Sequence, residues 1–369
     1  MARKLKSDRV LFLTTTALVA FSLVMVYSAS SAVALDKFQQ SNLFLTKQAV
    51  FVLVGMLALG LTMNTDYRLY RQPRVVWAIV GLSIAALAAV LVFGPPIKGA
   101  RRWFAVAGVG IQPSEFAKLA LIVFSAAVLE KRMDRIGEPL QALRPLALVL
   151  VPVLALVMAQ PDFGTTVTFI AIVGAMVFVA GLPYRYIGVA AGCLVPALAF
   201  VAISAPYRLR RLTAFLDPWS DPQGDGFQAI QSMVAVGTGG IMGRGLGESV
   251  QKLFYIPEPH TDFIYAVVAE ELGLIGATFV LMAFCVIAWR GLRVVSRAPD
   301  RFGAFLAIGV TIMIAAQAFG NISVVLGLLP TKGIALPFVS AGGSSLIINM
   351  AAMGILLNIS QQASAEAWE

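Results

Sequence analysis

The chain has 369 residues and a net charge of +9, and 59% of its residues are hydrophobic while only 13% are charged. Its mean hydropathy of +0.84 excludes an ordinary soluble protein, and in a membrane protein the basic charge is interpreted loop by loop, not as a sign of nucleic-acid binding. We therefore expect an all-α polytopic membrane protein that forms a single domain over residues 1–369, with no nucleic-acid partner.

Ten apolar stretches have about the 20 residues that a helix needs to cross a bilayer. The first follows MARKLKSDR, but it is longer than the apolar part of a signal peptide, so we interpret it as a helix. The ten predicted spans cover residues 10–32, 46–64, 75–93, 114–130, 143–159, 164–182, 184–204, 263–290, 302–328 and 339–360.

Basic residues are concentrated on one side of these spans. If the N-terminus is inside, the cytoplasmic segments hold most of the Lys and Arg residues, whereas the outer charges are nearly balanced. This bias predicts that both termini are cytoplasmic. Residues 205–262 then form the one large extracytoplasmic loop. It holds too many large apolar side chains for simple disorder, so we expect it to fold onto the outer face, with a short amphipathic or re-entrant helix around residues 227–236.

Within that loop, the glycine-rich stretch GTGGIMGRGLG matches neither of the common nucleotide-binding motifs, and no predicted strand precedes it. We interpret it as a loop whose backbone approaches another segment closely. Cys193 and Cys285 lie in apolar segments and do not form a secreted disulfide framework. With a single histidine in the chain, they also do not give a metal-ligand cluster of the usual spacing.

The fourth span begins with QPSEFAKLALIVF, in which Lys118 follows Glu115 by three residues, so the two side chains can touch. The pair is either self-neutralising or a means of presenting Lys118 to an anionic substrate, and ionisable groups inside membranes favour the second. Arg102 precedes it in IKGARRWFAVAG and either binds phosphate or contacts lipid headgroups. Asp162 of QPDFG either caps the sixth span or serves the site.

Near the C-terminus, Gln317 and Asn321 are one helical turn apart, which predicts hydrogen bonds between helices. The following stretch, LLPTKGIALPFVSAGGSS, combines Lys332 with Ser344 and Ser345. The two serines stand at the start of the last span, where hydroxyl and free N–H groups are available to an anion.

The stretch EPHTDFIYAVVAEELG, residues 258–273, gathers ionisable residues at the start of the eighth span. Its prolines keep the helix from beginning before about Thr261. Asp262 is either a helix cap or a general base, because nearby cations and an adjacent face of small residues suit a site. That face, Ala266, Ala269 and Gly273, either packs closely on a neighbour or leaves space beneath the carboxylate.

The other ionisable residues of the stretch are assigned by their helical positions. His260 is expected to orient the turn that carries Asp262. Glu270 lies about 80° from Asp262 around the helix and is expected to share its side, whereas Glu271 lies about 180° away and is expected to face another helix.

Taken together, these motifs resemble the SEDS family (shape, elongation, division, sporulation) over nearly the whole chain, from MVYSAS through the stretches quoted above. The resemblance implies ten transmembrane helices and a peptidoglycan glycosyltransferase that polymerises lipid II outside the bacterial cytoplasmic membrane. It also implies a class B penicillin-binding protein as the partner transpeptidase. LPTKG and QPDFGTT favour the division branch (FtsW) over the elongation branch (RodA), and hence the septum and other divisome membrane proteins. Ala341 departs from the tyrosine that is usual there.

The resemblance also assigns roles to residues. Asp262 would deprotonate the 4-hydroxyl of the acceptor sugar, or orient it with a divalent cation (Mg²⁺ or Mn²⁺), for attack on the anomeric carbon of the donor; no covalently bound cofactor is expected. Arg102, Lys118 and Lys332 would face the departing pyrophosphate, and Glu115 would hold Lys118. The expected substrate-binding set is Arg102, Glu115, Lys118, His260, Thr261, Lys332, Ser344 and Ser345.

Two other functions fit the same motifs. A lipid II flippase would need a polar path to both membrane faces, whereas the expected clustering of Arg102, Asp262 and Lys332 at the outer face favours chemistry on one side. A scaffold that only recruits the transpeptidase would leave Asp262 dispensable.

Overall fold

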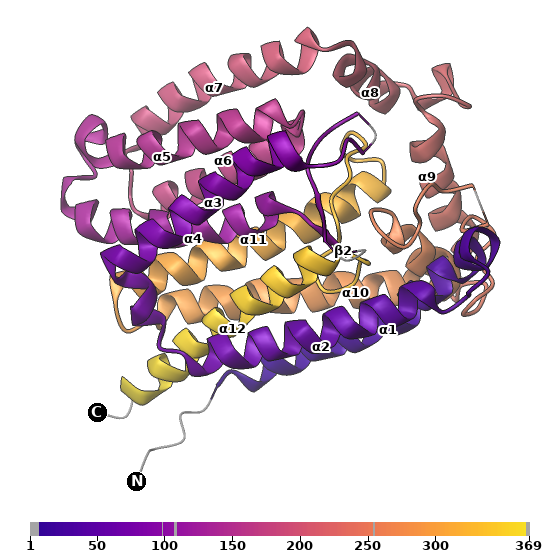
Figure 1. Cartoon of the computed structure of the whole chain (residues 1–369), viewed down its shortest axis with the longest axis horizontal. Coiled ribbons are helices and arrows are strands. Elements are labelled where there is room, and N and C mark those ends of the chain that lie inside the picture. The colour runs from indigo at the N-terminus through magenta and orange to yellow at the C-terminus, as the bar shows by residue number, and fades with distance from the viewer. Residues whose placement is uncertain (1–6, 98, 107–108, 254, 367–369) are drawn as a thin grey trace.

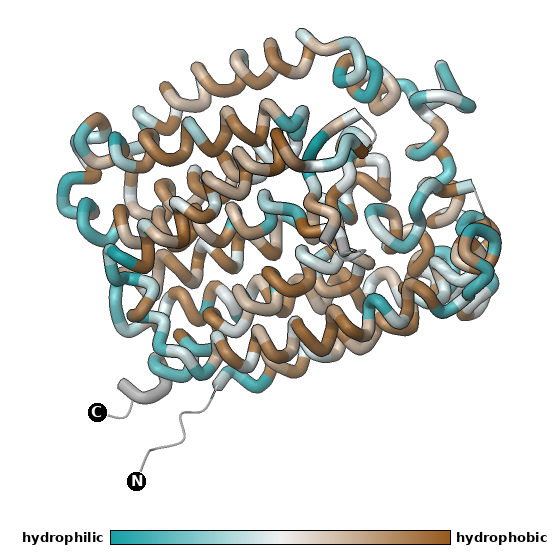
Figure 2. The backbone as a smooth tube through the Cα atoms, viewed as in Figure 1, coloured by the Kyte–Doolittle hydropathy of each residue, from teal (hydrophilic) through white to brown (hydrophobic). Residues whose placement is uncertain are grey.

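A computed structural model of the chain describes residues 7–97, 99–106, 109–253 and 255–366. Its long helices run roughly side by side across the view of Figure 1, and the first and last described residues lie at the same end of the bundle, as an even number of spans requires. Figure 2 shows hydrophobic residues along the helices and hydrophilic ones gathered toward the two ends. This is the distribution of a protein that crosses a bilayer. Which end faces the cytoplasm stays a prediction.

A helix lies at each of the ten predicted spans. Among the described residues, eight helices are long and apolar enough to cross a membrane; the other two are α6, which is apolar but has 17 residues, and α4, which carries charges at both ends. The ten helices are α1 (Arg9–Phe38), α2 (Leu43–Asn64), α3 (Pro73–Phe93), α4 (Pro113–Arg132), α5 (Pro139–Ala159), α6 (Phe163–Val179), α7 (Tyr184–Ser204), α10 (Ile264–Ser296), α11 (Arg301–Val325) and α12 (Gly343–Glu366).

Prolines and capping aspartates set several of the helix starts. Helices α3, α4 and α5 begin with proline, whose missing N–H would have no partner in the first turn. Asp8 caps α1 by accepting from the Leu11 N–H at 3.0 Å, and Asp300 caps α11 in the same way from Gly303 at 2.6 Å. Asp8 also pairs with Arg290 at 2.6 Å, which ties α1 to α10.

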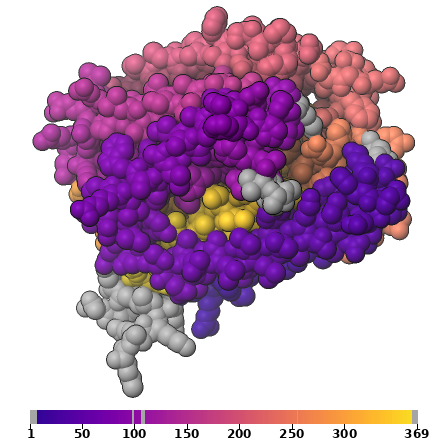
Figure 3. Space-filling view, in the orientation of Figure 1, coloured from indigo at the N-terminus to yellow at the C-terminus, as the bar shows by residue number. Residues whose placement is uncertain are grey.

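The core lies around α11 and α12, the helices whose apolar stretches are most completely buried. Helix α11 packs against α4, α6, α10 and α12, and α12 packs closely along α2. Figure 3 shows α12 in yellow at the floor of a hollow between α2 and α3. By contrast, α7 has no fully buried residue and forms the edge of the bundle (Figure 1).

The segment between α7 and α10 is structured, as predicted. It contains α8 (Pro206–Leu216), the short 3₁₀ helix η3 (Pro218–Ser220) and α9 (Phe227–Gly239), and α9 confirms the helix expected around residues 227–236. Helix α9 packs on α10 and α11. Helix α8 was not predicted, although the alternation of Arg and apolar residues in PYRLRRLTAFL makes it amphipathic.

Short elements complete the fold. The 3₁₀ helices η1 (Tyr67–Arg71) and η2 (Met133–Arg135) follow α2 and α4. A hairpin of β1 (Phe104–Val106) and β2 (Val109–Ile111) precedes α4, with antiparallel pairing of Phe104 to Ile111. Sequence periodicity did not predict this hairpin, because three-residue strands are too short to show alternation.

Helix α10 is interrupted at Gly273, whose φ of 68° and ψ of −164° are not helical. The glycine-rich loop after α9 enters this break and supplies the hydrogen bonds that the helix loses there. The bonds run from Arg244 N to Glu270 O (3.0 Å), from Gly245 N to Glu271 O (3.0 Å), from Leu274 N to Gly240 O (2.9 Å) and from Ile275 N to Ile241 O (3.3 Å).

Glycine is required where the loop meets α10. A Cβ at Gly243 would collide with the backbone of Glu271, and a Cβ at Gly239 would collide with the carbonyl group of Ala269. The expectation of a close backbone approach is therefore confirmed. At Ala269 and Gly273 the small-residue face packs against α9 and this loop, so this part of it serves close packing.

Candidate active site

Asp262 lies in a turn immediately before α10. The helix begins at Ile264 with Phe263 in the N-cap position, so it starts later than the sequence predicted and Asp262 precedes the cap residue. The residue is partly exposed. Asp262 is therefore not the N-cap residue of α10, and its place in the fold depends on other contacts.

Three hydrogen bonds fix the backbone of the turn. Each carbonyl of the His-Thr-Asp sequence accepts from a residue of the α11–α12 region: Ala341 N to His260 O (2.9 Å), Ser340 Oγ to Thr261 O (2.5 Å) and Asn321 Nδ2 to Asp262 O (2.6 Å). Asn321 also donates to Ile334 O at 2.6 Å. Asn321 was predicted to bond to another helix, but both of its acceptors lie outside helices, and the turn is held between α11 and the loop after it.

The carboxylate of Asp262 lies beside Gly333, in the loop between α11 and α12. A Cβ placed on Gly333 would stand 2.6 Å from Asp262 Oδ2, closer than real Cβ contacts allow. The chain neighbour of Gly333 is Lys332. The LPTKG sequence therefore brings the backbone of Lys332 close to Asp262, whereas the Lys332 side chain contacts Gly164 and Thr168 of α6.

Lys118 is buried in the bundle, and its ammonium group is paired. Its Nζ lies 2.8 Å from Glu115 and donates to Gln317 Oε1 of α11 at 3.0 Å. The contact with Glu115 confirms what the three-residue spacing predicted, and the bond to Gln317 confirms the interhelical role of that amide. Glu115 holds Lys118 in place, as expected.

Lys332 belongs to the same group of charges. Its Nζ lies 3.4 Å from Thr168 Oγ1 of α6, and its side chain rests against Gly164, where a Cβ would collide with it. Burial lowers the pKa of Lys332 to about 8, with the carboxylate of Asp162 opposing the decrease and the cation of Lys118 adding to it. Lys332 is therefore still largely cationic at neutral pH.

Arg102 holds the QPDFG turn. It donates from Nε to Gln160 O at 2.9 Å and from Nη2 to Pro161 O at 2.6 Å, while Asp162 caps α6 by accepting from the N–H and hydroxyl of Thr165 at 3.1 and 2.8 Å. The capping interpretation of Asp162 is confirmed. In the structure Arg102 positions the turn beside Lys332, and its predicted contact with phosphate stays a prediction.

Four further predicted substrate-binding residues make contacts within the fold. His260 is buried with its ring 4.4 Å from that of Phe44, and burial lowers its pKa to about 4, so it is neutral at pH 7. This fits the expected orienting role. The hydroxyl group of Thr261 donates to Glu258 O at 3.0 Å. The hydroxyl oxygens of Ser344 and Ser345 accept, from Gln112 N and from Asn349 Nδ2 respectively, each at 3.2 Å.

The two glutamates of α10 bind different segments. Glu271 accepts from Ser28 of α1 at 2.6 Å and pairs with Lys252 at 2.7 Å, which confirms that it faces another helix. The expectation that Glu270 shares the side of Asp262 was wrong. Glu270 is fully buried and its carboxylate accepts from Ser249 Oγ at 2.5 Å and from two backbone N–H groups of the loop that enters α10.

Sequence reasoning missed Lys252, which is 4% exposed. Besides Glu271, its Nζ contacts Ser28 Oγ at 3.1 Å and Gly247 O at 2.6 Å. In the sequence, the only indication of this role is that the lysine lies between the glycine-rich stretch and the His-Thr-Asp turn. It anchors the segment that leads to Asp262.

The side chains around Asp262 do not by themselves fit a divalent cation. Over the described part of the chain, no group of three or more His, Cys, Asp or Glu side chains lies close enough together to hold a metal ion. Divalent cations of the Mg²⁺ type prefer several oxygen ligands. A divalent cation at Asp262 stays a prediction.

Comparisons with known proteins identify the family of the chain. Residues 8–365 match the model of the cell cycle protein family FtsW/RodA/SpoVE. The chain is 44% identical to the probable peptidoglycan glycosyltransferase FtsW of Geobacter sp. (strain M18), over 96% of both chains. It is 42% identical to stage V sporulation protein E of Bacillus subtilis (strain 168), over 97% of this chain and 98% of that protein.

Solved structures share the fold. One chain of a peptidoglycan synthase complex that coordinates polymerization and crosslinking superposes with a TM-score of 0.80 at 33% identity, covering 97% of this chain and 99% of that one. RodA of Thermus thermophilus superposes with a TM-score of 0.70 at 28% identity, covering 97% and 98%.

Proposed function

Because the chain belongs to the FtsW/RodA/SpoVE family of cell cycle proteins, we propose that it is a peptidoglycan glycosyltransferase of the FtsW type, a multi-pass protein of the cytoplasmic membrane that polymerises lipid II. The observation that carries the mechanism is the position of Asp262. The residue is partly exposed, its turn is fixed by three hydrogen bonds to backbone carbonyl groups, and it lies beside the loop that carries Lys332.

Asp262 acts as the general base. The 4-hydroxyl of the acceptor sugar attacks the anomeric carbon of the donor, and its proton passes to the Asp262 carboxylate as the new C–O bond forms. The bond from that carbon to the pyrophosphate oxygen breaks, and undecaprenyl pyrophosphate leaves with the electron pair. A fixed turn holds the base in one geometry, which lowers the entropy lost in reaching the transition state.

Lys118 and Lys332 stabilise the negative charge that develops on the leaving pyrophosphate. Lys118 is 4% exposed and Lys332 is partly buried, and electrostatic interactions are stronger away from water than at an exposed surface. Glu115 compensates part of the charge of Lys118 before the substrate binds. Arg102 contributes indirectly, since it holds the turn against which Lys332 packs.

The partner is a class B penicillin-binding protein, and the process is cell division. Support for the partner comes from the likeness to a chain of a peptidoglycan synthase complex. Support for the division branch comes from FtsW relatives at 44 to 45% identity, against 27 to 28% for the RodA structures. The catalytic end of the bundle then faces outward, with both termini in the cytoplasm.

The test uses the protein purified with its transpeptidase partner, supplied with lipid II, with glycan polymer separated on gels. Wild type should form polymer and Asp262→Asn should form almost none while remaining folded, as judged by its thermal transition. Polymer from the Asn variant at the wild-type rate would overturn the role of Asp262. Absence of polymer from the wild type, together with movement of lipid II across vesicle membranes, would support a flippase.

A further inference from the structure

Two adjoining cavities lie on the loop side of the predicted site. The first, of about 240 Å³, is lined by Phe215, Pro218, Trp219, Ala229, Met233, Gly327, Leu329 and Thr331. The second, of about 260 Å³, is lined by Arg211, Gln223, Gly224, Asp225, Phe227, Gln228, Pro257 and Thr331. Thr331 lines both, so the two cavities meet at this residue, between the α8–α9 region and the loop after α11; we call the pair the α8–α9 groove.

The α8–α9 groove is lined in part by Thr331, which belongs to the same loop as the residue beside Asp262. Gly333 contacts the Asp262 carboxylate. Thr331 stands two residues before Gly333, so the Cα atoms of Thr331 and Gly333 are at most about 7.6 Å apart. Pro257, at the other side, leads into the turn that carries Asp262. A ligand that reacts at Asp262 and extends away from it by one or two sugar rings therefore meets this groove.

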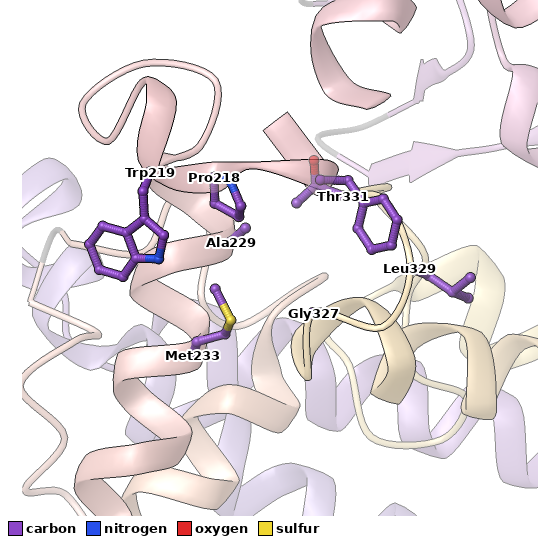
Figure 4. A pocket seen from close by; sticks show the side chains of 8 residues that line it. Pro218, Trp219, Ala229, Met233, Gly327, Leu329 and Thr331 are labelled. Carbon is purple, nitrogen blue, oxygen red and sulfur yellow. The ribbon is translucent and has the colours of Figure 1, made fainter. Parts of the chain in front are cut away.

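The two halves of the groove differ in chemistry. Figure 4 shows Trp219, Pro218, Ala229 and Met233 on one side of the first cavity, and Gly327, Leu329 and Thr331 on the other. Trp219 is 66% exposed although its ring is large and apolar. The second cavity instead presents the amides of Gln223 and Gln228 and the guanidinium of Arg211, which donate or accept hydrogen bonds.

The groove walls are held in place by the fold. Arg210 pairs with Asp225 at 3.1 Å, and Asp221 accepts from the N–H groups of Gly224 and Asp225 at 3.1 Å each. Ser232 of α9 donates to Val325 O of α11 at 3.1 Å, which joins the two sides. The groove is therefore preformed, as expected of a ligand site.

We propose that the α8–α9 groove binds the sugars of the glycan strand beyond the reacting pair. An exposed indole in the first cavity and amide and guanidinium groups in the second match successive sugars, because a pyranose ring offers apolar C–H faces for stacking and hydroxyl groups at its rim. Each cavity is too small for a polyprenyl chain, and the second is too polar for one. The inference rests on the proposed function, since it takes the strand made at Asp262 as the ligand.

The groove has a direct consequence for the product. Sugars held there keep the strand on the enzyme between additions, so the groove sets strand length and not the rate of a single transfer. Trp219→Ala and Gln228→Ala should therefore give shorter glycan strands from lipid II while the rate of the first coupling stays near wild type. Leu216→Ala is the matched control, because Leu216 is exposed on α8 and does not line either cavity.

Binding is measured separately from catalysis with a purified uncrosslinked peptidoglycan tetrasaccharide, followed by tryptophan fluorescence and calorimetry on the complex carrying Asp262→Asn. Removal of the stacked ring in Trp219→Ala should weaken binding by roughly tenfold, whereas Leu216→Ala should not change it. Because the background variant is inactive by design, this result stands even if the proposed glycosyltransferase activity fails.

Two outcomes would overturn the proposal. One is a tetrasaccharide affinity and a strand-length distribution that do not differ between Trp219→Ala, Gln228→Ala and Leu216→Ala. The other is loss of co-purification with the transpeptidase in the groove variants while tetrasaccharide binding is unchanged, which would make this surface a protein contact.

Discussion

The carboxylate of Asp262 lies against the backbone of Gly333, so the loop before α12 decides where the predicted base can stand. A Cβ at Gly333 would come within 2.6 Å of Asp262 Oδ2. Gly333→Ala should therefore push the carboxylate out of position and lower the polymerisation rate by about 10²-fold, the effect of a displacement near 1 Å in an active site. Glycan polymer formed from lipid II measures the rate.

Gly342→Ala in the same loop provides the matched control. Its added Cβ would meet only ordinary contacts, 3.6 Å from Ser345 and 3.9 Å from Ala335. Equal activity of the two alanine variants would contradict the proposed dependence on Asp262 geometry. Equal thermal transitions with different rates would confirm that the effect of Gly333→Ala is local.

The side chain of Lys332 can be displaced by a substitution at a neighbouring residue, with Lys332 itself unchanged. A Cβ on Gly164 would occupy the space of the Lys332 side chain, and a flexible side chain can move aside with little loss of stability. Gly164→Ala should thus reduce polymerisation about as much as Lys332→Met. Combining the two substitutions should add little further loss, because both remove the same cation.

On the same helix, Gly174 has open space around its Cβ position, so Gly174→Ala should retain wild-type activity. Additive losses in the Gly164→Ala, Lys332→Met double variant would show that Gly164 acts by another route.

Local pattern predicted much of this structure. The helices follow from apolar runs, and the contact between Glu115 and Lys118 follows from the helical period alone. Capping of α6 by Asp162 was one of two interpretations of a local sequence. These features depend on residues within a few positions of each other, which is the range over which sequence periodicity carries information.

Features that depend on distant partners could not be predicted. Lys252 meets Ser28, from which it is separated by 224 residues, and no pattern in either segment indicates the other. The break in α10 was also missed, because hydropathy does not register a change in φ and the apolar run continues past Gly273. The later start of α10, at Ile264, followed from the tertiary hydrogen bonds to the turn.

The activity should fall as pH rises through about 8. Burial lowers the pKa of Lys332 from 10.5 to about 8, so the cation that faces the pyrophosphate is present below that pH and lost above it. Lys332→Arg should shift this alkaline decline to higher pH, because arginine stays protonated. Initial rates of polymerisation between pH 6.5 and 9.5 give the profile.

The free energy of unfolding should rise with pH above about 8, whereas the activity should fall. Between pH 8 and 10.5 the unfolded chain binds a proton at Lys332 that the folded chain does not, so the Lys332 contribution makes the fold more stable as pH rises. A thermal transition that rises relative to Lys332→Met while activity falls would support this. An alkaline decline unchanged in Lys332→Arg would contradict the assignment to Lys332.

The ion pair between Lys252 and Glu271 should control the stability of the segment that leads to Asp262. The Glu271 side chain is fully buried and that of Lys252 is 5% exposed, so Lys252→Met leaves a carboxylate without its cation, which costs about 3–5 kcal/mol in buried pairs. Adding Glu271→Gln should recover part of the loss, since the unpaired charge is then removed.

Arg301→Met tests the same chemistry at the exposed pair with Asp134, where a loss of about 0–1 kcal/mol is expected. Denaturation of the purified variants in detergent gives the comparison, and equal losses for Lys252→Met and Arg301→Met would show that burial of the first pair has no energetic consequence.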